Sequence, residues 1–227
     1  MSDKKLITVV GATGAQGGAT ARALLRDPGF AVGSDAEVTC DGGRQRLPGA
    51  LYVMLHKPCG LLSATRDRDQ PTVLSLWPDA LAARLHLVGR LDKDTSGLLL
   101  LTDDGDWSHR ISSPRHHCAK VYVAELAEPL IAHAEQRLAD GVVLRNETAP
   151  TRPAQLQRIT DRRVRIQVTE GRYHLVRRLF AALGNRVTAL HRERIGGLQL
   201  DPRLAPGEWR ELDSDERAEV CSETRPR

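Results

Sequence analysis

The residues with the clearest chemical potential lie in one polar loop. The segment Gly89-Arg90-Leu91-Asp92-Lys93-Asp94-Thr95-Ser96-Gly97 stands directly before the apolar run of residues 98–101. A polar, glycine-bounded loop that enters a buried strand is a place where a rigid scaffold can hold a catalytic group. Asp92, in the middle of this loop, is therefore a candidate catalytic residue. Taken alone, the same aspartate can also be explained as a turn cap.

A second segment places an aromatic ring among polar side chains. Lys120-Val121-Tyr122 belongs to an alternating run that predicts a strand, with Lys120 and Tyr122 on one face and Val121 and Val123 on the other. An aromatic ring on the polar face of a strand makes Tyr122 a candidate for a functional role. It can equally be an ordinary tyrosine on the surface of a sheet.

The third segment is Glu170-Gly171-Arg172-Tyr173-His174-Leu175-Val176-Arg177-Arg178, and helical spacing runs over residues 173–183. At about 100° per residue, the apolar side chains fall on one stripe: Tyr173, Val176, Leu179, Phe180 and Leu183. Arg177 falls on the edge of this stripe, where it can be partly buried and reach a carboxylate. His174 and Arg178 point away from the stripe, so Arg178 can contact phosphate on the outer face of the helix. Taken alone, Arg177 can also be explained as an ordinary arginine on the helix surface.

The charge of the chain is compatible with a nucleic-acid partner. The 227 residues carry a net charge of +4, with a pI of about 9.1 and 41% hydrophobic residues. A modest positive charge permits nucleic acid without requiring it. Most cations are arginines, whose planar fork suits phosphates and can stack on bases. Residues 170–194 hold six arginines against two acidic residues, with aromatic and histidine side chains between them, which is a local basic footprint.

Two metal-binding patterns are only partly matched. Asp92, Asp94 and Ser96, with Gly97 and an aspartate in the twelfth place, partly fit a calcium loop. The apolar run 98–101 and the segment before residue 89 do not fit an EF-hand. The histidines and the cysteine between residues 109 and 118 fit no closed zinc site. We therefore expect no metal.

An α+β domain that begins near residue 51 must position these groups. We expect strands over residues 51–55, 98–101, 119–126 and 163–168, the last with one basic face, and helices over residues 131–139 and 173–183. The charged tail after residue 212 is expected to fray.

The N-terminal part has a different character. Gly11-x-x-Gly14-x-x-Gly17 follows a short strand pattern and precedes a helix pattern, as in a dinucleotide-binding turn. Residues 4–32 resemble the start of an NmrA-like, NADP-sensing Rossmann protein, but no parallel sheet follows. We expect no cofactor, and Gly11, Gly14 and Gly17 are the only candidates to bind one.

The three polar segments, in this order, resemble the three motifs of the RsuA-type pseudouridine synthases. The resemblance covers almost all of residues 51–212 and includes the segments 107–118 and 190–197. These two segments are most similar to the small-subunit enzymes rather than to their large-subunit relatives. The resemblance implies a pseudouridine synthase fold, with a mixed, mostly antiparallel sheet, flanking helices and a short Rossmann-like βα fragment in front.

The resemblance also implies the roles of individual residues. Asp92 would break the bond between uracil and ribose, Tyr122 would pack against the uracil ring, and Arg177 would pair with Asp92 and orient it. The target base would first leave its stack. Further contacts with RNA would come from seven side chains: Lys57, Arg90, Lys120, Arg172, His174, Arg178 and Arg192. Neither a metal nor an organic cofactor is required.

Such enzymes usually begin with an S4 RNA-binding domain, of which only a hairpin-like end near residues 36–43 is similar here. We therefore divide the chain into a Rossmann-like fragment (1–34), an S4-like hairpin and linker (35–50), a catalytic domain (51–216) and a tail (217–227). The missing front of the S4 domain leaves the choice of RNA site open.

The expected activity is conversion of uridine 516 of 16S ribosomal RNA to pseudouridine. The alternatives are a synthase acting on 23S ribosomal RNA, an RNA-binding module without activity, or an NADP-binding sensor. The expected partner is ribosomal RNA in an assembling small subunit. We also expect a monomer. A cytoplasmic location is expected because the cysteines form no CxxC pair and no segment is apolar enough to span a membrane.

Overall fold

The computed structural model describes residues 37–40, 43–46, 49–113 and 116–221. The chain divides into two compact units, residues 1–50 and residues 51–227. In the first unit, β1 (Glu37–Cys40) and β2 (Gly43–Arg46) form an antiparallel hairpin. These two strands lie where a hairpin-like segment was expected, near residues 36–43. The dinucleotide-like turn with Gly11, Gly14 and Gly17 lies outside the described residues.

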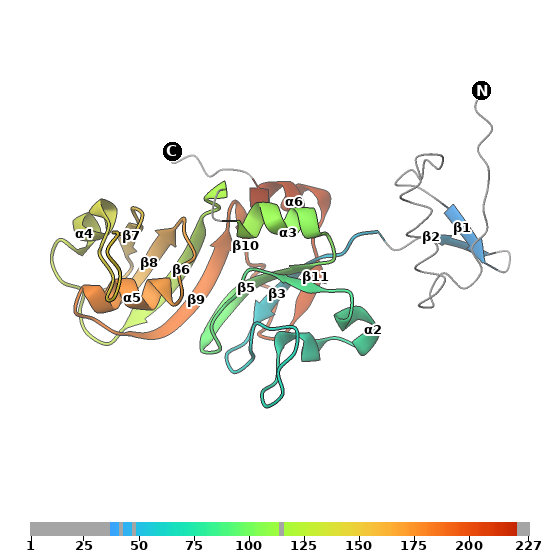
Figure 1. Cartoon of the computed structure of the whole chain (residues 1–227), viewed down its shortest axis with the longest axis horizontal. Helices are drawn as coiled ribbons and strands as arrows, with labels where there is room; N and C mark the ends of the chain where they lie inside the picture. Colours follow the sequence, from blue (N-terminus) through green and yellow to red (C-terminus); the bar gives the residue numbers. More distant parts are fainter. Residues whose placement is uncertain (1–36, 41–42, 47–48, 114–115, 222–227) are drawn as a thin grey trace, which may run out of the picture. The chain divides into compact units, whose positions relative to one another are not determined.

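The second unit is built on a nine-stranded sheet (Figure 1). Its strands are β3 (Tyr52–Lys57), β4 (His86–Val88), β5 (Thr95–Thr102), β6 (Lys120–Leu126), β7 (Gln155–Arg158), β8 (Arg163–Val168), β9 (Val187–Ile195), β10 (Leu198–Gln199) and β11 (Trp209–Glu211). The main path runs β11-β3-β5-β9-β6-β8-β7, while β4 pairs with β5 and β10 with β9. Only β5 and β9 pair in parallel among the described strands. The predicted α+β class with a mixed, mostly antiparallel sheet is confirmed.

Strand β5 is continuously apolar over residues 98–101 because both of its faces are covered there. Leu98 and Leu100 pack in one core cluster, together with Trp107 and Ile111. Leu99 and Leu101 face the opposite side and belong to a second cluster. A strand buried on both faces has a continuous apolar sequence instead of an alternating one.

Short helices cover the two faces of the half of the sheet that contains β5. They are η1 (Val73–Leu76), α2 (Asp79–Ala82), α3 (Gly105–Ser112) and α6 (Ser214–Cys221). Helices α3 and α6 lie against one another (Figure 1). The side chain of Asp104 caps α3 by accepting a hydrogen bond from the Trp107 amide. The tail expected to fray instead forms α6, whose Val220 is 1% exposed in the core, so the structured part continues past residue 216.

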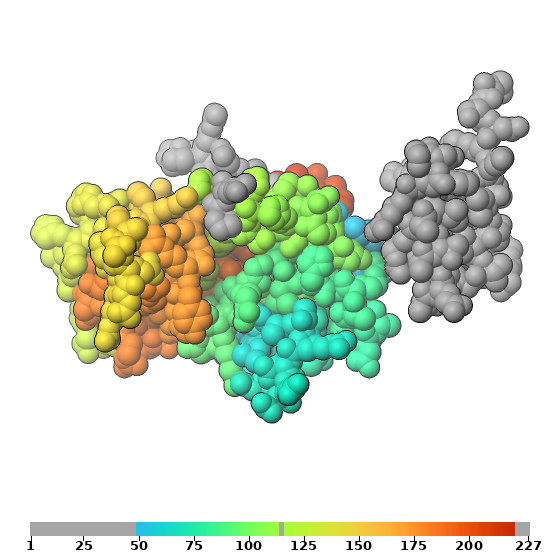
Figure 2. Space-filling model, viewed as in Figure 1, coloured from blue at the N-terminus to red at the C-terminus, as the bar shows by residue number. Residues whose placement is uncertain are grey.

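The other half of the sheet carries α4 (Ala134–Asp140) and α5 (Leu175–Ala182) on one face. In Figure 2 this half is the yellow-to-orange mass beside the green and cyan one. The predicted alternation of β8 is confirmed: Val164 and Ile166 are buried, and Arg163 and Arg165 lie on the other face. These arginines pair with Glu125 and Glu193.

Helices α4 and α5 begin later than the sequence predicted, because the residue before each helix has a left-handed backbone conformation. His133 and His174 have φ angles of 59° and 49°, and each directly precedes its helix. A left-handed residue cannot continue a right-handed helix, so α4 starts at Ala134 and α5 at Leu175. Within the described part of the chain, no helix is long and apolar enough to cross a membrane.

Candidate active site

A cavity of about 740 Å³ gathers most of the residues to which the sequence assigned chemistry. Its walls come from the loop before β5, from β6, and from the segment that leads into α5. Asp92, Tyr122 and Arg177 all line it. Five of the seven candidate RNA contacts line it as well: Arg90, Lys120, Arg172, His174 and Arg192. Lys57 and Arg178 do not.

The Asp92 loop is held from beneath by the ammonium group of Lys57. Its Nζ donates to the backbone oxygens of Pro58, Asp92 and Thr95 at 2.9, 3.1 and 3.0 Å. Lys57 is 0% exposed, and this burial lowers its pKa from the usual value. Lys57 was expected to contact RNA, but its side chain has no exposed surface in this structure, because the ammonium is bound to the backbone of the loop.

The carboxylate of Asp92 faces His174 rather than Arg177. His174 Nε2 lies 3.3 Å from Asp92 Oδ1, whereas Arg177 pairs with Asp94 at 2.8 Å. Arg177 also donates to the carbonyl of Val187 at 3.1 Å, which joins the helix to β9. The predicted pairing of Arg177 with Asp92 is thus wrong for this structure, because the aspartate two residues further along the loop reaches the guanidinium instead.

Arg192 forms part of the floor next to Tyr122. The residue is 3% exposed, and its guanidinium donates to the carbonyl of Leu98 at 2.8 Å and lies 3.4 Å from the Tyr122 hydroxyl. It also stands 5.9 Å from the centre of the Tyr122 ring, within reach of a cation–π contact. The strands approach so closely here that a Cβ on Gly97 would lie 2.2 Å from the backbone oxygen of Arg192. Glycine is therefore required at this point of the loop.

Some of the other cations that were expected to contact RNA are partly neutralised by acidic neighbours. Arg178 pairs with Glu147 at 2.5 Å, and Arg172 pairs with the same carboxylate and with Glu170. Lys120 donates to the carbonyl of Cys118 at 2.8 Å, and burial lowers its pKa. Among the candidate RNA contacts at the cavity, Arg90 has the exposed side chain. The electropositive character of the rim is therefore smaller than the arginine count suggested.

Tyr173 is the residue that the sequence placed wrongly. Its position on the helical stripe predicted burial, yet it is 76% exposed and lines the cavity. The cause is the left-handed backbone of His174, which ends the helical register one residue after Tyr173. An arginine-rich segment containing an aromatic residue was the available sequence signal.

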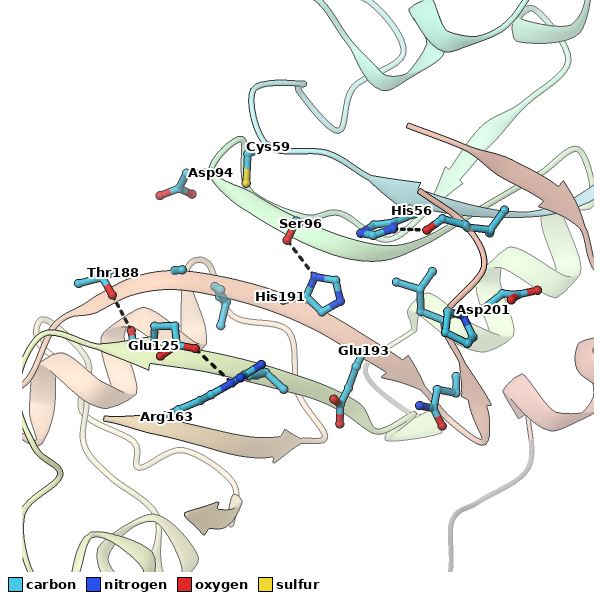
Figure 3. Close-up of a pocket in the computed structure, with 17 residues that line it drawn as sticks. His56, Cys59, Asp94, Ser96, Glu125, Arg163, Thr188, His191, Glu193 and Asp201 are labelled. Atoms are coloured by element: carbon cyan, nitrogen blue, oxygen red, sulfur yellow. Dashed lines mark hydrogen bonds and ion pairs between the residues drawn. The ribbon is translucent and has the colours of Figure 1, made fainter. Parts of the chain in front are cut away.

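A second cavity, of about 570 Å³, contains none of the three predicted catalytic residues (Figure 3). Ser96 and His191 are hydrogen-bonded there, 2.9 Å apart, and the ring of His56 meets that of His191 edge-on at 5.5 Å. Burial, and then the nearby His56, lower the pKa of His191. Asp94 lines this cavity while its partner Arg177 lines the first one, and Leu190 lines both, so the two cavities are neighbours.

The described residues contain no group of three His, Cys, Asp or Glu side chains placed to hold a metal ion. The partial calcium pattern runs along β5, and its last aspartate, Asp103, pairs with Arg84 at 2.6 Å. The cavity instead offers a carboxylate, an aromatic ring and buried cations. These groups can attack a sugar carbon, hold a flat base and stabilise negative charge without a metal.

Comparison with known proteins gives this arrangement a family. The model of the RNA pseudouridylate synthases matches residues 51–182. Two proteins called "Ribosomal small subunit pseudouridine synthase A" are similar to this chain. That of Yersinia pestis is 53% identical over 82% of this chain and 80% of its own length, and that of Escherichia coli K12 is 49% identical over 87% and 86%. The structure described as "Crystal structure of pseudouridylate synthase" superposes with a TM-score of 0.74 at 38% identity, over 90% of this chain and 93% of that one. The chain belongs to the RNA pseudouridylate synthase family.

Proposed function

We propose that this protein converts a uridine of small-subunit ribosomal RNA to pseudouridine, with Asp92 as the nucleophile. The relatives named for this reaction are about half identical over more than four fifths of the chain. The observation that carries the assignment of Asp92 is its position: the carboxylate lines the cavity, while its backbone is anchored by the buried Lys57. Uridine 516 of 16S RNA remains our proposal for the target.

The reaction is an isomerisation, and its atoms balance without a co-reactant. The bond between ribose C1′ and uracil N1 breaks, the base rotates, and a bond forms between C1′ and C5. The hydrogen on C5 leaves as a proton, and N1 gains a proton. Asp92 attacks or stabilises the sugar at C1′ while the base is detached.

The remaining residues of the cavity restrain the detached base. Tyr122 offers its ring face to the uracil, and Arg192 holds the tyrosine hydroxyl from below. In place of the direct pairing that the sequence suggested, Arg177 acts through Asp94 and Val187 to fix the loop against α5 and β9. Preorganised groups of this kind lower the barrier because they need no rearrangement at the moment of reaction.

The proposed setting is an assembling small ribosomal subunit in the cytoplasm, with the enzyme as a monomer. A target base must be extruded from its stack before it can reach Asp92, which favours RNA whose structure is still incomplete. No NADP-dependent step enters this proposal.

The reaction can be measured by release of tritium from RNA labelled at C5 of uridine, because C5 loses its hydrogen when the new bond forms. We expect Asp92→Asn to lower the rate by at least about 10³-fold, as removal of a nucleophile does in other enzymes. Asp79→Asn is the matched control, since Asp79 is exposed in the first turn of α2 and does not line the cavity. Release by Asp92→Asn within about tenfold of the wild-type rate would remove Asp92 from its role.

A further inference from the structure

Tyr173 is an aromatic residue that the fold does not use for packing. Its exposed fraction of 76% is the highest among the large hydrophobic residues that are exposed in the described part of the chain. Its hydroxyl has no hydrogen-bond partner among the described residues. The ring therefore contributes little to the stability of the fold, and its exposure requires another explanation.

The ring is nevertheless fixed in place. It stacks on the imidazole of His174 with the ring centres 3.7 Å apart and an angle of 21° between the planes. The backbone beneath is held as well, because the guanidinium of Arg178 donates to the carbonyl of Tyr173 at 3.4 Å and its amide donates to that of His174 at 3.0 Å. One face of the tyrosine is thus covered by the histidine, and most of its surface is open to solvent.

This stacked pair stands at the cavity that holds the nucleophile. Tyr173 and His174 both line the cavity, and His174 Nε2 is 3.3 Å from the Asp92 carboxylate. Arg90 supplies an exposed cation at the same cavity. A flat aromatic surface beside cations is the arrangement with which proteins bind unpaired RNA bases.

We propose that Tyr173, stacked on His174, forms a binding site for the RNA base adjacent to the uridine that enters the cavity. The inference rests on the proposed function, since it takes the RNA chain to continue past the reacting nucleotide. Extrusion of a uridine removes stacking from its neighbours. The open tyrosine face replaces that lost stacking and orients the strand, so that the target ribose comes to Asp92.

The side chain of His174 links this site to the chemistry. The same imidazole supports the tyrosine ring and reaches Asp92, so a base stacked on Tyr173 is two contacts away from the nucleophile. Stacking of an RNA base on an aromatic ring does not require a particular base, because every base has a flat face. The site is therefore expected to support binding and positioning rather than the choice of sequence.

The test combines variants of the protein with RNA lacking single bases. The probes are a small-subunit ribosomal RNA transcript and fragments of it in which the nucleotide on the 5′ or 3′ side of the modified uridine is abasic. Affinity is measured by fluorescence anisotropy, and turnover by tritium release. Tyr173→Ala should weaken RNA binding and raise KM by roughly 5- to 100-fold, with kcat at saturating RNA changed by less than about threefold. Tyr173→Phe should bind RNA as the wild type does. Tyr173→Leu should lose most of the affinity that the aromatic ring contributes.

One of the two abasic fragments should weaken wild-type binding by a similar factor and have no further effect on Tyr173→Ala, because the two changes remove the same contact. Ile159→Ala is the matched control, since Ile159 is 42% exposed and lies outside the cavity. Equal affinity of Tyr173→Ala and wild type for intact RNA overturns the stacking site, whatever the turnover. The stacking site is also overturned if each abasic fragment lowers the RNA affinity of the wild type and of Tyr173→Ala by the same factor. Absence of tritium release by the wild type overturns the proposed function, and weaker binding by Tyr173→Ala would still support the stacking site.

Discussion

Replacement of Lys57 by methionine removes the charge beneath the loop that carries Asp92 while keeping a side chain of similar length. The ammonium has three N–H groups. The backbone oxygens of Pro58, Asp92 and Thr95 accept from it at 2.9, 3.1 and 3.0 Å, and a longer contact of 3.5 Å reaches the oxygen of Lys93. Two of these oxygens belong to Asp92 and Thr95, which are separated from Lys57 by 35 and 38 positions along the chain. The variant therefore detaches the loop from β3 without opening a large cavity.

The cost follows from the lost donors and the relieved charge. A buried polar group without a partner costs about 1–3 kcal/mol, so three carbonyls give roughly 3–9 kcal/mol. Removal of a buried ammonium returns several kcal/mol of desolvation energy. Because Pro58 and Asp92 are only partly buried, water can reach their carbonyls, and we expect a net loss of about 2–4 kcal/mol in the free energy of unfolding. Displacement of Asp92, the proposed nucleophile, by about 1 Å can lower the rate by about 10²-fold.

Guanidinium chloride unfolding measures the first quantity, and single-turnover tritium release at saturating RNA measures the second. Lys93→Met is the control from the same loop, because Lys93 is exposed and its ammonium donates to the side chain of Gln70. We expect this control to change stability by less than about 0.5 kcal/mol. If Lys57→Met matched the control in both stability and rate, the buried ammonium would not be holding the loop.

Two further predictions concern groups on either side of this loop. The pair between Arg177 and Asp94 is partly exposed, with side-chain exposures of 20% and 68%, so Asp94→Asn should change stability by less than about 1 kcal/mol. Arg177→Met also loses the bond to the Val187 carbonyl and should cost about 2–3 kcal/mol; equal losses in the two variants, measured by denaturant unfolding and tritium release, would contradict this division. Burial lowers the pKa of His191 from its ordinary 6.5, so the unfolded chain binds a proton at a higher pH than the folded protein does. Stability should therefore fall as pH drops below 6.5, by up to about 1.4 kcal/mol per pH unit, until the folded histidine is protonated as well. His191→Gln should reduce this slope in unfolding experiments between pH 7.5 and 5.5, and an unchanged slope would refute the assignment.

The sequence predicted the parts of the fold that depend on local pattern. The alternation of residues 163–168 and the apolar run 98–101 gave strands whose burial agrees with the structure. It could not predict where α4 and α5 begin, because a left-handed histidine has no strong sequence signal. It also missed α6, since a charged helix in which Val220 alone is buried among residues 214–220 has too little periodicity to detect.

The same limit applies to the candidate site. Motif spacing identified the three segments that meet at the cavity, because each lies at a fixed place next to a recognisable strand or helix. It could not decide between Asp92 and Asp94 as the partner of Arg177, since both carboxylates lie on one short loop and the choice depends on where α5 stands. Nor could it separate a lysine that contacts RNA from one that is buried, because Lys57 is followed by proline and looks like a strand end at the surface.

The backbone of the Asp92 loop and the carboxylate of Asp92 are held by different contacts. The backbone is fixed by Lys57 from β3 and by the parallel pairing of residues 95–97 with β9, where Gly97 permits close approach. Arg177 holds the loop from α5 through Asp94. The carboxylate of Asp92, in contrast, meets one imidazole at 3.3 Å, and that imidazole is itself stacked under an exposed tyrosine. A nucleophile, the role proposed for Asp92, needs a fixed position and a free lone pair. This arrangement would supply both, because among the described residues substrate has to displace the His174 contact rather than a buried ion pair.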